Sequence, residues 1–298
     1  MSLRITQGMM NTQLMRDLNR NLGRMQKLQE QMNSGMKINR PSDDPVGITY
    51  GLRYRSELST NEQYKENVNM ANSWLEFSDK MLTQTENVFH RLKELTIKAS
   101  TGTNNEGALD AIKVEVEELR EQLLDIANSK LNGKYVFNGQ LTDQPPYTSG
   151  NAANDITDDR RIPLTLGAEV QVPINISGNE IFGQPGADDN AFKIFDDLIT
   201  ALGDKDFAAI SATLDKQEQR MDEVLAMHAE IGARTNRVDL IENRLKDLGL
   251  NLESMQSKVE DADYAELIIK SKINESIYNA SLSVGAKIIT PSLVDFLR

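Results

Sequence analysis

The chain has 298 residues, of which 39% are hydrophobic but only 5% aromatic, and it contains no cysteine. Compact enzymes usually carry more aromatic mass in their cores, so this composition is more typical of long helices, and the lack of cysteine excludes disulfides and thiolate metal sites. The formal net charge of −12 argues against nucleic acid as a partner.

The first segment carries leucine and methionine at intervals of three and four residues. This spacing puts their side chains on one face of a helix, which we expect to end near Gly35. The predicted face consists of Leu14, Leu18, Leu22, Met25, Leu28 and Met32.

A turn is predicted after this helix, because Ser42, Asp43 and Asp44 stand between two prolines. Each of these polar side chains is able to cap a following helix, and the prolines favour a change of chain direction. We interpret Ser42, Asp43, Asp44 and Pro45 as the turn between two helices.

Long helices are predicted on both sides of the chain centre. From Val68 to Ala99 apolar residues alternate steps of three and four, and the pattern resumes after the loop 100–107. Helix returns from about Asn190, and the most regular repeat begins at Val238. Because a 3.5-residue period is that of coiled-coil or bundle helices, we expect these helices to form a core within the chain. Contact between subunits is the alternative.

The segment between these helices has a different pattern of apolar residues. Residues 162–176 place apolar side chains at every second position, which predicts antiparallel strands with a turn at Gly167-Ala168. Pro163 and Pro173 fall on the opposite face and favour edge strands. The sequence therefore predicts a small β insertion over residues 133–186.

The last segment carries a second apolar face, formed by Ile269, Ile273, Ile277, Ala280, Val284 and Ile288. Small residues are frequent from Asn279 to Lys287, which permits the close approach of a neighbouring backbone.

Taken in order, these elements predict a mainly α fold. It is a long helical rod, built as a coiled-coil-like bundle from both chain ends, with a small inserted antiparallel β domain. The predicted domains are a terminal helical assembly domain (1–42 plus 264–298), a helical rod domain (43–132 plus 187–263) and the β insertion domain (133–186).

The two chain ends are predicted to be incomplete by themselves. Two helices side by side cover only part of two apolar stripes, whereas ordering the backbone costs roughly 1–2 kcal/mol per residue. We therefore expect both ends to be mostly disordered in the free monomer and to fold against neighbouring subunits. A cytoplasmic coiled-coil scaffold is the alternative, and it predicts ends that are already folded in the monomer.

No residue pattern points to catalysis, a cofactor or a metal ion. His90 and His228 lie in separate helical segments without metal-ligand spacing, and the paired carboxylates lie beside turn residues, where capping explains them. No stretch approaches the roughly eighteen apolar residues of a membrane span, and the start lacks the apolar segment of a Sec signal peptide. We expect no enzyme activity, no membrane insertion and no cleaved signal peptide.

Both ends of the chain resemble the bacterial flagellin superfamily. The matching stretches are RIT (4–6), SGMKINRPSDDPVGI (34–48), GLRYRSEL (51–58) and YAELIIKSKINESIYNASLSVGAKIITPSLVDFL (264–297). The resemblance covers nearly the whole chain except the β insertion, although Ser2-Leu3 precede the usual Arg-Ile start. The motif GKYVFNGQLTDQPPY (133–147) and the ending SLVDFL are similar to the members that join the flagellar hook to the filament. A compact filament flagellin is the alternative.

This resemblance implies an extracellular structural protein of the bacterial flagellum. It implies export through the flagellar type III apparatus, with an export chaperone bound to the C-terminal helix. Copies of the chain would then form a ring between hook-associated protein 1 and flagellin. The two terminal apolar faces would make the contacts between subunits, and residues 42–45 would form the turn between inner and outer domains.

Overall fold

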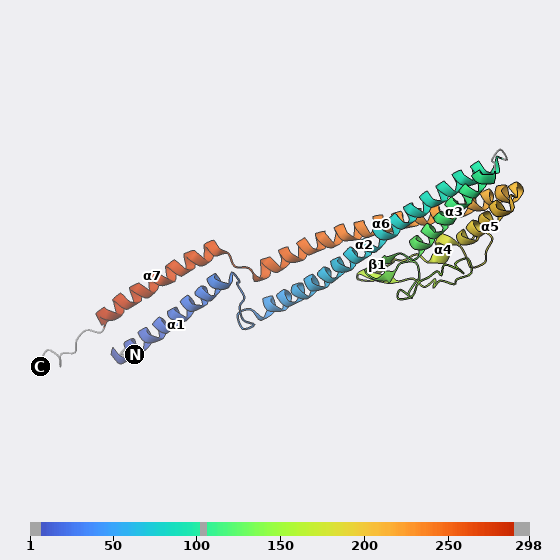
Figure 1. Ribbon diagram of the computed structural model, residues 1–298. Coiled ribbons are helices and arrows are strands. Elements are labelled where there is room, and N and C mark those ends of the chain that lie inside the picture. Colours follow the sequence, from blue (N-terminus) through green and yellow to red (C-terminus); the bar gives the residue numbers. More distant parts are fainter. Residues whose placement is uncertain (1–6, 102–105, 289–298) are drawn as a thin grey trace, which may run out of the picture. The chain divides into compact units, whose positions relative to one another are not determined.

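The computed structural model describes residues 7–101 and 106–288 of the chain (Figure 1). Long helices dominate and two short antiparallel sheets lie between them, which confirms the mainly α fold with a small β insertion. The RIT and SLVDFL motifs lie outside the described residues. The elements in chain order are α1 (Gln7–Ser34), α2 (Pro45–Ser100), α3 (Glu106–Ala127), β1 (Lys130–Leu131), β2 (Lys134–Tyr135), β3 (Pro163–Gly167), β4 (Val170–Pro173), α4 (Gly178–Phe182), α5 (Ala191–Asp204), α6 (Phe207–Glu260) and α7 (Tyr264–Ile288).

The chain divides into two compact units. Unit 1 comprises Met1–Thr60 and Leu248–Arg298, and unit 2 comprises Asn61–Asp247. Both boundaries fall inside the long helices α2 and α6. The finer division into three domains stays a prediction.

Helix α2 begins at Pro45, well before the apolar repeat becomes regular. Asp44 caps its first turn, since its Oδ1 accepts hydrogen bonds from the backbone N of Val46 at 3.1 Å and of Gly47 at 2.9 Å. Proline suits the first helical position because its missing N–H would be unsatisfied there anyway. Of the three polar residues that the sequence offers as caps, Asp44 is the one that acts on α2.

Unit 2 is organised around one hydrophobic core, to which α2, α3, α5 and α6 all contribute. An aromatic cluster anchors the β region to this core. The Tyr147 ring lies 5.5 Å from that of Phe182 and 4.9 Å from that of Phe192, measured between centroids. Asn190 caps α5 by accepting hydrogen bonds from the backbone N of Phe192 and Lys193, so helix returns where the sequence predicts it.

The predicted hairpin is present, with its turn shifted by one residue. Strands β3 and β4 pair antiparallel, but a bulge after Thr165 lets Gly167 still pair with Val170. The turn therefore falls on Ala168-Glu169, with Glu169 in the left-handed region at φ 60°, and not on Gly167-Ala168. The reason is that a bulge adds one residue to a strand, which an alternation pattern does not reveal.

Candidate assembly interface

Helices α1 and α7 pack against each other in unit 1 (Figure 1). The side of α1 that is covered consists of half-buried apolar residues and one buried asparagine, Asn21. Leu22 belongs to the predicted face but remains 43% exposed, so Asn21 takes its place in the contact. The covered residues are Leu14, Leu18, Asn21, Met25, Leu28 and Met32.

The covered side of α7 is not the apolar face that the sequence singles out. It carries Leu267 followed by mostly small or polar residues at alternating steps of four and three. We call this side the α7 seam: Leu267, Ser271, Asn274, Tyr278, Ser281 and Gly285. The Nδ2 of Asn21 donates a hydrogen bond to the backbone O of Asn274 at 3.3 Å. A Cβ on Gly285 would lie 2.7 Å from Cδ2 of Leu14, so a larger residue at this position would force the Leu14 side chain to shift.

The predicted apolar face of α7 stays in solvent in the single chain. Ile269 is 60% exposed, and Ile273, Ile277 and Val284 are each about half exposed. At 3.6 residues per turn this face lies roughly 120° around the helix from the seam. We call these four residues, with the exposed Ala280, the α7 outer face. The side chain of Ile288 lies outside the described residues.

The connection from α1 to α2 is ordered by Asp43. Its Oδ2 accepts hydrogen bonds from the backbone N of Arg40 at 3.1 Å and of Asn39 at 3.3 Å, and its Oδ1 lies 2.8 Å from Nζ of Lys27. The hydrogen bond from Lys27 is the largest influence on this carboxyl, and together with the backbone donors it lowers the pKa of Asp43. Ser42 is exposed. Within the predicted turn, Asp43 therefore binds the preceding segment, Asp44 caps α2 and Ser42 faces solvent.

A short β-bridge pairs Met36, just after α1, with Asp261, just before α7. The apolar pattern of the sequence does not predict this bridge. The backbone N of Lys37 donates to the O of Glu260 at 2.6 Å, and the N of Ala262 donates to the O of Gly35 at 3.0 Å. The Tyr264 hydroxyl donates to the O of Met32 at 2.9 Å. Gly35, at φ 71°, supplies the left-handed turn that ends α1. The bridge therefore lies where α1 ends and α7 begins.

Glu260 is the buried charge of unit 1. Its side chain is 2% exposed, and its Oε2 accepts hydrogen bonds from Nη2 of Arg55 at 2.8 Å and from Nε2 of Gln256 at 2.8 Å. A Cβ on Gly51 would lie 2.2 Å from Oε1 of Glu260. The glycine thus makes room for the carboxylate between α2 and α6.

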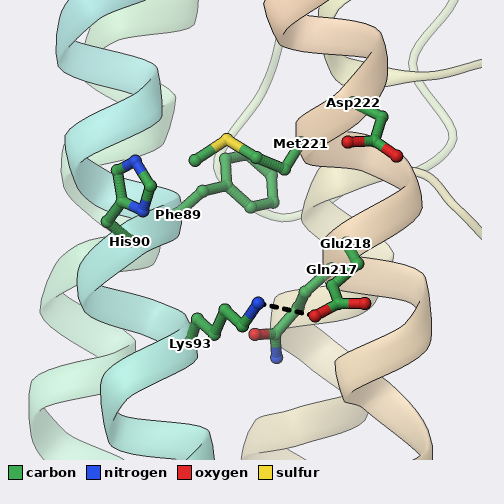
Figure 2. Close-up of a pocket in the computed structure, with 7 residues that line it drawn as sticks. All are labelled: Phe89, His90, Lys93, Gln217, Glu218, Met221 and Asp222. Carbon is green, nitrogen blue, oxygen red and sulfur yellow. Dashed lines mark hydrogen bonds and ion pairs between the residues drawn. The ribbon is translucent and has the colours of Figure 1, made fainter.

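Unit 2 contains a pocket of about 230 Å³ between α2 and α6 (Figure 2). Phe89 and Met221 form its apolar part, and the charged Lys93 and Glu218 pair across it with Nζ 2.6 Å from Oε1. Gln217 uses its Nε2 to donate to Oγ1 of Thr96 at 2.9 Å. Lys93 and Glu218 thus neutralise each other, and the lining includes no hydroxyl or thiol nucleophile. The remaining lining residues are His90 and Asp222.

No group of three or more His, Cys, Asp and Glu residues within 7–101 and 106–288 is placed to hold a metal ion. No helix in the same part of the chain combines the length and apolar character needed to cross a membrane.

Comparison with known proteins matches both ends of the chain. The model of the bacterial flagellin N-terminal helical region matches residues 5–142, and that of the C-terminal helical region matches residues 214–297. The chain is 25% identical to flagellar hook-associated protein 3 of Escherichia coli, over 94% of this chain and 95% of that protein. It is 27% identical to flagellin of Bacillus subtilis, over 91% of each. The fold is similar to the crystal structure of flagellar hook-associated protein 3 from Legionella pneumophila, with a TM-score of 0.62, 15% identity, and coverage of 69% of this chain and 98% of that chain.

Proposed function

Because the chain belongs to the bacterial flagellin family and is a structural component of the flagellum, we propose that it forms the junction between hook and filament. In this proposal copies of the chain form a ring that binds hook-associated protein 1 on one side and flagellin on the other. The match to hook-associated protein 3 over 94% of the chain supports the junction role.

The observation that carries the proposal is the α7 outer face. A row of isoleucine and valine side chains half exposed to water gains roughly 25 cal/mol for each Å² that a neighbour covers. In the single chain α7 presents to α1 its seam of small and polar residues, so its apolar side is left for another subunit. We propose that this face, with Ile288, binds the equivalent helices of neighbouring copies.

The predicted α1 face divides between two roles in this proposal. Leu14, Leu18, Met25, Leu28 and Met32 are half-buried against α7, so they join the two terminal helices of one chain. Their remaining exposed area, together with Leu22, would meet neighbouring subunits.

We also propose an extracellular location, reached through the flagellar type III export apparatus without a cleaved signal peptide. An export chaperone would cover α7 before assembly. The exposed isoleucines are the kind of surface that an amphipathic groove or helix of a chaperone recognises.

The test replaces apolar side chains of the α7 outer face and leaves the residues of the α7 seam unchanged. A strain producing the triple variant Ile269→Ser, Ile273→Ser, Ile277→Ser should complete hooks and release flagellin unpolymerised into the medium. Leu240→Ser is the matched control, because Leu240 is 71% exposed on a helix of unit 2. Electron microscopy of hook tips and the amount of flagellin in the medium give the readout. Normal filaments in the triple variant would contradict the proposal.

A compact filament flagellin is the second candidate, favoured by the 27% identity to flagellin of Bacillus subtilis. Deletion of the coding sequence distinguishes the two functions. Loss of a junction protein leaves hooks without filaments and flagellin in the medium. Loss of the main filament subunit also leaves hooks without filaments, but the medium then contains no flagellin. That result would favour the second candidate.

A further inference from the structure

His228 of α6 reaches two carboxylates of α2 at once, within unit 2. Its Nδ1 lies 2.6 Å from Oε1 of Glu86, and its Nε2 lies 2.9 Å from Oδ1 of Asp79. Asp79 and Glu86 are seven residues apart, about two helical turns, so both project from one side of α2. The imidazole ring fills the space between them.

This geometry requires a particular protonation state. An ionised carboxylate only accepts hydrogen bonds, so each ring nitrogen must carry a proton to be bonded at these distances. Only the imidazolium ion has two N–H groups. A neutral ring would turn one nitrogen lone pair toward a carboxylate oxygen, which is repulsive.

The charges around the ring are of one sign. Asp79 and Glu86 face it from α2, and neither forms an ion pair with a lysine or arginine in the part of the chain that the structure describes. On α6 itself the nearest acidic neighbour, Glu230, is already bound to Arg234. His228 is therefore the cation that these two carboxylates share.

The local electrostatics agree with this geometry. Burial disfavours the charged ring, but the hydrogen bonds and negative charges of Glu86 and Asp79 outweigh it, so the pKa of His228 is raised. The side chain is 28% exposed, and water screens part of the attraction.

We infer that His228 is a protonation-dependent clamp between α2 and α6, closed as the imidazolium ion and released as the neutral ring. The clamp lies beside the core, because Val224 and Ile231 on the same side of α6 are fully buried. Its release thus weakens the attachment of α6 to α2 beside these buried core residues.

The sign of the pH dependence follows from the raised pKa. The clamp contributes its full stabilisation below the ordinary histidine pKa, near 6.5. That stabilisation is lost as the pH rises through the higher pKa of the folded protein. The contribution of His228 to the stability of unit 2 is accordingly larger in mildly acidic than in alkaline medium.

His90 is the only other histidine of the sequence, so the variant His90→Gln assigns the His228 imidazole signal. Proton NMR of this variant should give His228 a titration midpoint above the ordinary histidine value, near 6.5. Asp79→Asn and Glu86→Gln should each move the His228 midpoint down. A midpoint at or below the ordinary value would overturn the inference.

Urea unfolding followed by Trp74 fluorescence provides the second readout, because this single tryptophan lies in the core of unit 2. The urea midpoint of the native sequence and of His90→Gln should fall as the pH rises past the His228 titration. That of His228→Gln should change less over the same range. An identical pH dependence in all three proteins would show that the ring does not tie the helices together.

Discussion

The two units differ most in where their apolar side chains lie. Every member of the hydrophobic core cluster belongs to unit 2. In the described part of unit 1 the buried apolar side chains are Ile38, Leu252 and Leu267. The same unit exposes Met9, Met10, Met15, Leu22, Val46, Tyr50, Leu52, Leu248, Leu250, Met255, Tyr264, Ile268, Ile269, Ile273, Ile277, Leu282 and Val284.

The charges divide in the same way. Lys and Arg exceed Asp and Glu by two in unit 1, whereas acidic residues are in excess by fourteen in unit 2. Unit 2 therefore has a buried core under a strongly charged, solvated surface, as expected of a domain that is stable alone. Unit 1 is held by a β-bridge, helix caps and the ion pair of the buried Glu260 with the partly exposed Arg55, while much of its apolar area stays exposed. We propose that neighbouring subunits cover this area and complete the helix pair.

The largest expected contrast between the units comes from removing one apolar side chain in each. Phe89→Ala should cost about 3–5 kcal/mol in the free energy of unfolding, because Phe89 is 2% exposed and packs edge-to-face on Phe195 at 6.2 Å. Ile273→Ala should stay within about 0.5 kcal/mol in the free chain. Urea unfolding followed by Trp74 fluorescence and by helical circular dichroism measures both variants. A large loss for Ile273→Ala would break the comparison, since it would mean that α7 is packed in the monomer.

The next effect tests the buried charge of unit 1. Gly51→Ala would bring a Cβ against Glu260 and should destabilise unit 1 by about 1–3 kcal/mol through overpacking. Gly23→Ala is the matched control, because a Cβ there meets no atom within 4 Å and better helix propensity should gain up to about 1 kcal/mol. In limited proteolysis, the terminal helices should be cleaved fastest in Gly51→Ala, more slowly in the native chain and most slowly in Gly23→Ala. Equal cleavage of both would show that Glu260 moves aside freely.

A smaller effect is expected at the start of α2. Asp44→Ala removes the acceptor for two backbone N–H groups and should cost about 1 kcal/mol. Ser42→Ala should change stability by less than about 0.5 kcal/mol, because Ser42 is exposed. Hydrogen exchange of the first turn of α2 reports this local loss. Equal exchange in both variants would assign the cap to another group.

The smallest effect concerns Asp43 and pH. Because the pKa of Asp43 is lowered, its contribution to unit 1 is present above the ordinary aspartate pKa and is lost as the pH falls through the lowered value. Lys27→Gln should raise the pKa of Asp43 toward its usual range. A carbon-13 titration of the Asp43 carboxyl measures this, and an unchanged midpoint would mean that the backbone donors alone set it.

Unit 2 was more predictable from sequence than unit 1, for a physical reason. Buried leucine, valine and phenylalanine recur in unit 2 with a clear period. The predicted helices from Val68 onward, the return of helix near Asn190 and the hairpin were therefore confirmed. The early part of α2, in unit 1, packs through Gly47 and Gly51, which an apolar period does not register.

In the terminal helices α1 and α7, the apolar period also fails to identify the contact surface. On α7 the regular apolar residues form the exposed outer face, whereas small and polar residues such as Asn274 and Gly285 form the contact with α1. Sequence periodicity found the surface that faces away from the chain. It could not find the β-bridge at Met36 or the burial of Glu260, because both depend on backbone positions far apart in sequence.

Hydrogen exchange on the chain before and after assembly tests the central claim most directly. In dilute monomer, α1 and α7 should exchange rapidly, while the parts of α2, α3 and α6 in unit 2 stay protected. After assembly onto hook tips, the two terminal helices should become as protected as unit 2. Strong protection of α1 and α7 in the dilute monomer would contradict the claim that neighbouring subunits complete them.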